Sequence, residues 1–169
     1  MLFALLALAA TGTQAYPDPL TPAASGQVQC YAPTDRKTCT SIGTYTANGD
    51  GTFANGASIL LNKQPVVIMQ STTPVTIKAG AVCGTITRDN IAKAGLTVNG
   101  QALPPEKAGP VLEQIAGALG SVIDHEICTT YVPDGAGFTA KSVMDGKAQP
   151  NQDQKVIWVS PSDGYTVAP

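Results

Sequence analysis

Residues 30–39 read CYAPTDRKTC, so two cysteines flank eight residues that include a proline and an aspartate. Proline and aspartate favour tight turns. If residues 33–36 form a four-residue turn, the flanking chain pairs as an antiparallel hairpin in which Cys30 lies opposite Cys39. Directly opposed Cα atoms in such a hairpin are about 4.5–5.5 Å apart, a separation that a disulfide bridges. The stretch therefore predicts a β-hairpin closed by a Cys30–Cys39 disulfide.

The chain has two further cysteines, Cys83 and Cys128. Four cysteines allow three pairings. Once the hairpin uses the first two, a Cys83–Cys128 disulfide follows by exclusion. Zinc sites commonly need cysteines separated by two to four residues, or a Cys/His cluster. Here the nearest two cysteines are separated by eight residues and the chain has one histidine. We therefore expect two structural disulfides, no metal site and no cofactor.

The N-terminus predicts export. An apolar run at residues 2–10 is followed by small residues at Thr13 and Ala15, the pattern of a secretory signal peptide cleaved after Ala15, although no lysine or arginine precedes the run. Residues 16–26 contain three prolines and predict a flexible leader. Residues 27–169 then form a single disulfide-stapled, β-rich domain. Stable disulfides are typical of oxidising compartments, so we expect a periplasmic or secreted location.

Strand signals predominate in that domain. Short segments rich in β-branched residues and bounded by turn residues predict strands at residues 27–32, 37–46, 57–62, 65–70, 74–79, 81–87, 139–144 and 155–160. One helix is predicted by the apolar stripe at residues 110–123. Pro105 would allow an earlier start, but Pro110 favours a kink or a start near Pro110. The expected fold is α+β: a mainly antiparallel, curved β-sheet of about eight strands with one α-helix packed across a face.

Composition limits the partners. The chain has 10 Lys and Arg against 12 Asp and Glu, and aromatic residues make up 5%. It therefore lacks the basic stripe and the aromatic series with which proteins bind nucleic acid. After the signal peptide no apolar run reaches the length of about 20 residues that a transmembrane helix needs. We expect a soluble protein whose partner is a protein, a component of the cell envelope or a small ligand.

The triplet Asp124-His125-Glu126 is the strongest catalytic candidate. A histidine beside carboxylates acts as a general base in many hydrolases, and Ser121 or Ser142 would then be the nucleophile. Adjacent residues point in different directions, however, so the triplet need not converge. The chain also lacks the Gly-x-Ser-x-Gly elbow of many serine hydrolases. A solvent-facing polar turn is the favoured interpretation, and His125 is a weak candidate.

Two loop-like stretches carry further hypotheses. Residues 48–56, NGDGTFANG, have the glycines and polar residues of a calcium loop but too few oxygen ligands at the required positions, so a glycine-rich turn is favoured. The stretch Val132–Phe138, VPDGAGF, has the composition of an exposed loop, which a secreted protease inhibitor would present to its target.

The signal peptide, the disulfides and the missing catalytic motif favour a non-enzymatic binding or interaction domain of the bacterial cell envelope. The absence of Asn-x-Ser/Thr sequons agrees with a bacterial origin. One alternative is a hydrolase that uses His125 as general base. A second alternative is a protease inhibitor that presents residues 132–138.

Overall fold

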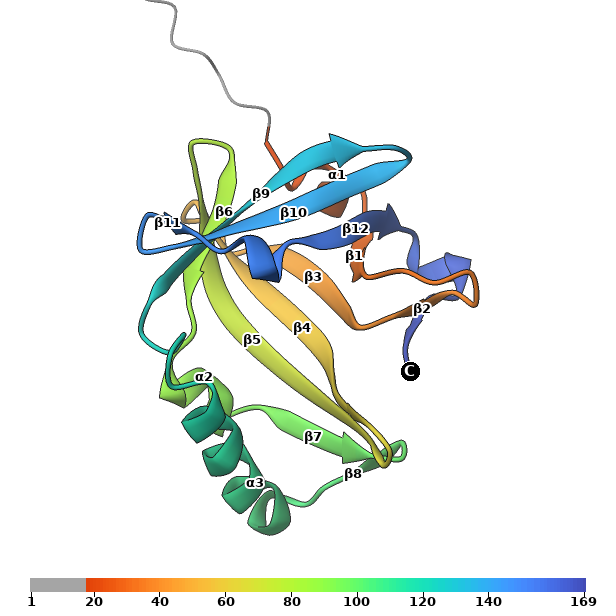
Figure 1. Ribbon diagram of the computed structural model, residues 1–169, viewed down its shortest axis with the longest axis vertical. Coiled ribbons are helices and arrows are strands. Elements are labelled where there is room, and N and C mark those ends of the chain that lie inside the picture. Colours follow the sequence, from red (N-terminus) through yellow and green to blue (C-terminus); the bar gives the residue numbers. More distant parts are fainter. Residues whose placement is uncertain (1–17) are drawn as a thin grey trace, which may run out of the picture.

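The computed structural model describes residues 18–169 (Figure 1). The predicted signal peptide and the first two residues of the predicted leader lie outside this range. Eight antiparallel strands form a closed barrel in the order β4-β3-β1-β12-β10-β9-β6-β5, and β5 pairs with β4 to close it. These strands are β1 (Val28–Tyr31), β3 (Ser41–Ala47), β4 (Thr52–Lys63), β5 (Val66–Lys78), β6 (Ala81–Thr85), β9 (Glu126–Asp134), β10 (Gly137–Met144) and β12 (Gln154–Val159).

The remaining elements are short, with one exception. They comprise the strands β2 (Thr38–Cys39), β7 (Gly95–Val98), β8 (Gln101–Ala102), β11 (Lys147–Ala148) and β13 (Thr166–Val167), the helices α1 (Thr21–Ala24), α2 (Arg88–Ala92) and α3 (Pro105–Ala118), and the 3-10 helices η1 (Pro150–Gln152) and η2 (Pro161–Asp163). The predicted mainly antiparallel fold with a single long helix and two disulfides is confirmed. The curved sheet closes on itself. Among the α-helices and strands, seven were not predicted from the sequence: the helices α1 and α2 and the strands β7, β8, β9, β11 and β13.

The hairpin of β4 and β5 extends beyond the barrel. One edge of β5 pairs with β6 through Val75–Lys78 and with β7 through Val67–Gln70. The two helices α2 and α3 lie beside the β7 end of this hairpin (Figure 1). Their apolar side chains form a core with Met69 of β5 and Leu96 of β7. Helix α3 therefore packs on this extension of the sheet.

Helix α3 begins at Pro105 and contains Pro110, so the expected start near Pro110 is wrong. Proline at the first helical position is favourable because its missing N–H has no partner there in any case. The buried residues Ala108, Leu112 and Ala116 are spaced four apart and lie on one stripe. Packing of this stripe against the core holds the first turn in helical form despite the hydrogen bond that Pro110 removes.

The Cys30–Cys39 disulfide is present, with its Cα atoms 5.4 Å apart. The hairpin that led to its prediction is different, because β1 pairs with β3 and Cys30 lies opposite Ile42. Ala32 and Lys37 have φ angles of 47° and 58°, in the left-handed region, and they turn the chain away from the expected pairing. Residues 32–40 therefore leave the barrel as a loop, and β2 pairs in parallel with β13.

The Cys83–Cys128 disulfide is also present and has the directly opposed cross-strand placement that was expected of the other pair. Cys83 of β6 and Cys128 of β9 lie directly opposite each other, with Cα atoms 4.0 Å apart. The bond therefore joins two neighbouring strands of the barrel wall.

Residues 18–26, the described part of the predicted leader, contain helix α1. Leu20 just before this helix is 2% exposed and packs with Val75 and Val82. The side chains of Tyr45 and Trp158 pack against the same cluster. Leu20 therefore covers one end of the barrel.

Candidate functional site

The barrel encloses a cavity of about 210 Å³ that opens to solvent. Successive side chains of a strand point to opposite faces, so every second residue lines the interior. The apolar lining consists of Ala57, Ile59, Val75, Val82, Gly84, Ile86 and Ile127. The polar lining consists of Tyr31, Tyr45, Asn55, Ser71, Thr73, Thr129 and Tyr131. The cavity thus combines an apolar wall with uncharged polar groups.

Three of these polar groups, the tyrosine hydroxyls, converge on one buried side chain. Gln29 is 0% exposed. Its Oε1 accepts hydrogen bonds from the hydroxyls of Tyr45 at 2.8 Å, Tyr31 at 2.9 Å and Tyr131 at 3.2 Å. The hydroxyl of Tyr131 also lies 2.9 Å from that of Tyr31 and 3.3 Å from that of Tyr45. We refer to Gln29, Tyr31, Tyr45 and Tyr131 as the tyrosine cluster.

Burial keeps the tyrosine cluster uncharged. Desolvation raises the pKa of Tyr31 and of Tyr45 well above the usual range for a phenol, and the neighbouring Tyr131 raises both pKa values further. A phenolate would be a buried charge without a partner, which is costly. Both phenols therefore remain protonated at physiological pH.

The amide of Gln29 is only half satisfied. Its Nε2 is buried and has no hydrogen-bond partner among residues 18–169. Exchanging the two amide atoms would leave a buried acceptor without a partner instead of a donor, because the same hydroxyls surround the same position. Buried polar atoms without partners are rare in folded proteins, since each costs about 1–3 kcal/mol. The Nε2 of Gln29, without a partner among residues 18–169, therefore lowers the stability of the folded protein.

The members of the cluster come from three strands, β1, β3 and β9. Gln29 and Tyr31 are two residues apart in β1 and so point to the same face. Tyr131 is separated from Gln29 by 102 positions in the sequence. None of the four residues was predicted from the sequence to be functional. The Gln-x-Tyr spacing of β1 was the available signal, but the partners depend on barrel closure.

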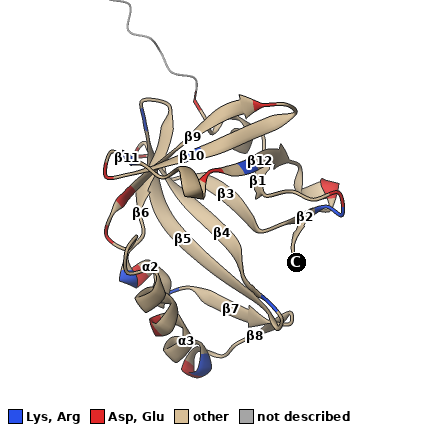
Figure 2. Ribbon diagram, in the orientation of Figure 1, with Lys and Arg blue, Asp and Glu red and all other residues tan. Residues whose placement is uncertain are grey.

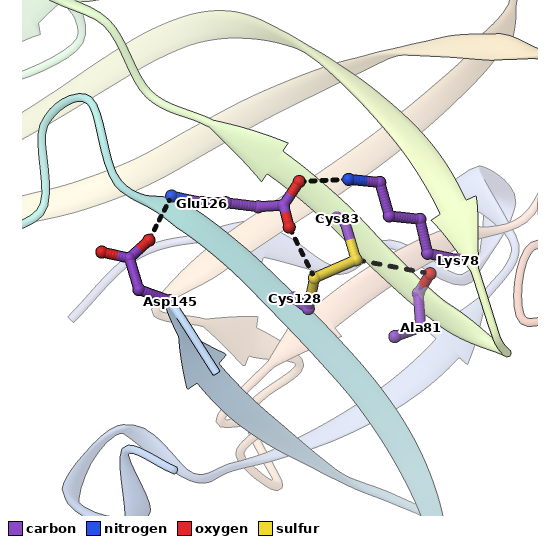
Figure 3. The surroundings of a disulfide bond; sticks show 6 residues. All are labelled: Lys78, Ala81, Cys83, Glu126, Cys128 and Asp145. Atoms are coloured by element: carbon purple, nitrogen blue, oxygen red, sulfur yellow. Dashed lines mark hydrogen bonds and ion pairs between the residues drawn. A yellow bond between two sulfur atoms is a disulfide. The ribbon is translucent and has the colours of Figure 1, made fainter. Parts of the chain in front are cut away.

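His125 lies at the surface, just before β9. Its Nδ1 pairs with Asp145 Oδ2, and both side chains are about half exposed. The imidazole lowers the pKa of the Asp145 carboxyl, and the N–H of Glu126, which donates to Asp145 Oδ1 at 3.1 Å, lowers it further (Figure 3). This arrangement fixes the ring at an exposed turn.

The two proposed serine nucleophiles are not joined to His125. Ser142 pairs with Thr129 across β10 and β9 and so shares the inner face of the barrel with it. Within the described chain no hydrogen bond links His125 to Ser121 or Ser142. The hydrolase hypothesis gains no supporting contact and stays a prediction.

The stretch Val132–Phe138 forms a hairpin. Residues 132–134 end β9, residues 137–138 begin β10, and Asp134 pairs with Gly137, which leaves a two-residue turn. Asp134 also accepts a hydrogen bond from Thr139 and forms an ion pair with Lys155. The segment is thus held along most of its length, and the inhibitor hypothesis remains untested.

The glycine-rich stretch at residues 48–56 contains the turn between β3 and β4. Asp50 Oδ1 accepts hydrogen bonds from the backbone N–H of Thr52 at 2.9 Å and from its hydroxyl at 2.6 Å. Gly49 and Gly51 have φ angles of 84° and 85°, which favour glycine. The favoured interpretation as a glycine-rich turn is confirmed for residues 48–51, and Thr52–Gly56 belong to β4.

A carboxylate lies beside the second disulfide (Figure 3). Glu126 Oε2 is 3.8 Å from Cys128 Sγ, and the same carboxylate forms an ion pair with Lys78. Cys83, Cys128 and Glu126 are close enough to surround an ion. The two sulfurs are bonded to each other, so they offer no thiolate ligand. We therefore assign this cluster a structural role.

No helix within residues 18–169 combines the length and the hydrophobicity required to span a membrane. Comparison of the chain with protein families, with curated proteins and with solved structures finds no match. The candidate function therefore rests on the geometry of the barrel.

Proposed function

We propose that this protein is a small, non-enzymatic binding domain, exported to the bacterial cell envelope or beyond, that holds a small ligand inside its barrel. The single observation that carries this proposal is the solvent-accessible cavity of about 210 Å³ with the three tyrosines of the tyrosine cluster in its wall. Eight-stranded barrels either fill their interior with side chains or hold one small ligand. A mainly apolar pocket with a few convergent polar groups is the usual form of a ligand site.

The residues that line the cavity favour a ligand-binding interior over one that serves only the packing of the barrel. Close-packed interiors leave few voids larger than a water molecule. Here the inward-facing residues Ser71 and Thr73 of β5 keep partial exposure, although they face the barrel interior. A cavity that served stability alone would be filled, because each unfilled volume forfeits packing energy.

The outer surface formed by residues 18–169 has no concentration of one charge that would favour the binding of nucleic acid or of another highly charged partner. Figure 2 shows Lys and Arg interspersed with Asp and Glu, mostly at turns, helices and strand ends. The formal net charge of the whole chain is −2. A surface of mixed charge provides no extended field to attract a highly charged ligand. The interior is thus the more specific feature of the described part.

The binding proposal is tested by filling the cavity from one strand. Thr129 of β9 lines the cavity, and its neighbour Thr130 is exposed and points outward. We expect that small aromatic probes such as 4-methylphenol and p-xylene perturb the amide NMR signals of inward-facing residues. Thr129→Phe should abolish these perturbations, whereas the matched control Thr130→Phe should preserve them. Binding of neither probe to the unaltered protein would refute the proposal.

Export is tested separately. The predicted signal peptide and the two disulfides suit an oxidising compartment. Protein expressed from the full sequence and collected from the periplasm or the medium should begin at Tyr16 and contain no free thiol. Full-length protein that stays in the cytoplasm with four reactive thiols would contradict this part of the proposal.

A further inference from the structure

Each hydroxyl proton of the tyrosine cluster has a hydrogen-bond acceptor within the cluster. A carbonyl oxygen has two lone pairs, and the shortest contacts to Gln29 Oε1 come from Tyr45 and Tyr31. The proton of Tyr131 has two acceptors within the cluster, Gln29 Oε1 at 3.2 Å and the hydroxyl oxygen of Tyr31 at 2.9 Å. All three protons are used within the cluster. What the tyrosines offer to a ligand is therefore the lone pairs of their oxygens.

Asn55 adds a further acceptor to the same wall. Its Nδ2 donates to the backbone carbonyl of Thr44 at 3.1 Å. A carbonyl can only accept, so this bond fixes the orientation of the amide. Asn55 Oδ1 receives no hydrogen bond from residues 18–169, and the side chain lines the cavity. The polar groups of the wall whose hydrogen bonds fix them are thus acceptors, whereas a serine or threonine hydroxyl can donate or accept.

The cavity provides no counter-charge. None of its lining residues is Asp, Glu, Lys, Arg or His. An ion that entered would lose its hydration without gaining an opposite charge, which is strongly unfavourable. The raised pKa values of Tyr31 and Tyr45 agree with this environment, since the phenols themselves remain neutral.

The volume limits the ligand to a small ring system. An apolar cavity of about 150 Å³ is large enough to bind benzene. The cavity of about 210 Å³ therefore accommodates one aromatic ring with a few substituents, or a compact bicyclic molecule. Its apolar lining from β4, β5, β6 and β9 suits the body of such a molecule.

We infer that the ligand is an uncharged, mainly apolar molecule of about this size that carries an O–H or N–H donor, which it places against the oxygens of the tyrosine cluster and Asn55. Phenols and indoles are examples of this chemical class. This inference rests on the proposed binding function and specifies the ligand further, as an uncharged molecule with a hydrogen-bond donor.

Three probes of similar shape separate the inference from the function on which it rests. The first, 4-methylphenol, carries a donor; p-xylene replaces its hydroxyl with a methyl group; 4-methylbenzaldehyde offers only an acceptor. Dissociation constants come from amide chemical-shift titrations of the full protein. We expect 4-methylphenol to bind about five- to tenfold more tightly than either of the others, as one net hydrogen bond implies.

Two variants assign the preference to the tyrosine cluster. Tyr131→Phe removes one acceptor and leaves the bonds from Tyr31 and Tyr45 to Gln29 intact. It should weaken 4-methylphenol about fivefold and leave p-xylene unchanged. The matched control is Tyr165→Phe, because Tyr165 packs against the Cys30–Cys39 cluster on the outer side of the barrel. This control should change neither probe.

The relative affinities of the three probes distinguish failure of the donor inference from failure of the binding function. Equal binding of 4-methylphenol and p-xylene, or tighter binding of the aldehyde, would refute the donor inference and leave the binding function intact. Failure of all three probes to bind would overturn the binding function and the inference together.

Discussion

Replacement of Leu20 by alanine tests whether the segment before the predicted domain boundary at Gln27 belongs to the fold. Leu20 is 2% exposed, whereas the four residues of helix α1 that follow include none that is buried. A helix of four residues is not stable alone, since isolated helices need about 12–15 residues. The docking of residues 18–26 therefore depends mainly on Leu20, which packs against Val75, Val82 and Trp158.

The expected loss follows from this burial. Leucine to alanine removes three carbon atoms, each worth about 0.8 kcal/mol when buried, and the cavity left behind adds to the cost. Substitutions of buried leucine span about 2–5 kcal/mol. Here the segment can undock, so the loss cannot exceed the free energy of docking. We expect the free energy of unfolding to fall by about 3 kcal/mol, or about 6–12 °C in Tm.

Urea unfolding monitored through the fluorescence of Trp158 measures this change, because Trp158 is the only tryptophan of the chain and packs in the same cluster. The matched control is Leu61→Ala, since Leu61 is 39% exposed. It should change the free energy by less than about 0.5 kcal/mol. Removal of all residues before Gln27 should cost at least as much as Leu20→Ala. A deletion that costs less than the substitution would refute the reasoning.

Loss of the Cys83–Cys128 bridge, with both cysteines replaced by alanine, should lower the free energy of unfolding by about 4 kcal/mol, because the bridge closes a loop of 45 positions. The same change at the Cys30–Cys39 bridge, which spans 9 positions, should lower the free energy of unfolding by about 2.5 kcal/mol. Denaturant titration measures both losses. A larger loss at Cys30–Cys39 than at Cys83–Cys128 would show that burial of the sulfurs outweighs loop entropy. Asp145 has a pKa lowered by the adjacent imidazole, so its contribution to stability is present above the unfolded pKa of about 3.9 and is lost as the pH falls through the folded pKa. Asp145→Asn should therefore flatten the acid side of the curve of unfolding free energy against pH, and an unchanged curve would contradict this assignment. Gly137→Ala should destabilise the protein by about 1–3 kcal/mol in thermal unfolding, because the new Cβ would lie 2.7 Å from the backbone carbonyl and a side chain of β12. Gly117→Ala in helix α3 meets no atom within 4 Å and should stabilise it by up to about 1 kcal/mol, so an equal loss at both glycines would argue against these contacts.

Much of the fold follows from local features of the sequence. Turn residues and β-branched segments mark most of the strands, and the apolar stripe of α3 marks the long helix, because these signals depend on neighbours a few residues away. Helix α2 had a signal that was overlooked, since Thr87 and Asn90 cap its first turn reciprocally. Strand β5 runs on through Pro74, where only β4 pairs with it, because the pairing of β5 with β7 ends at Gln70 of β5 and its pairing with β6 begins at Val75.

The sequence by itself predicted the predominance of antiparallel strands, the one long helix and the two disulfide pairs, although the Cys30–Cys39 pair was derived from a hairpin that does not form. Cysteine count, turn residues and periodicity can be read from the sequence without knowledge of the fold, because they depend on composition or on neighbours a few residues away. Only the tertiary structure decided that the sheet closes, that Leu20 covers one end, and that Gln29 meets Tyr45 and Tyr131. These contacts join residues up to 102 positions apart, and their formation depends on strand order and register that no local pattern encodes.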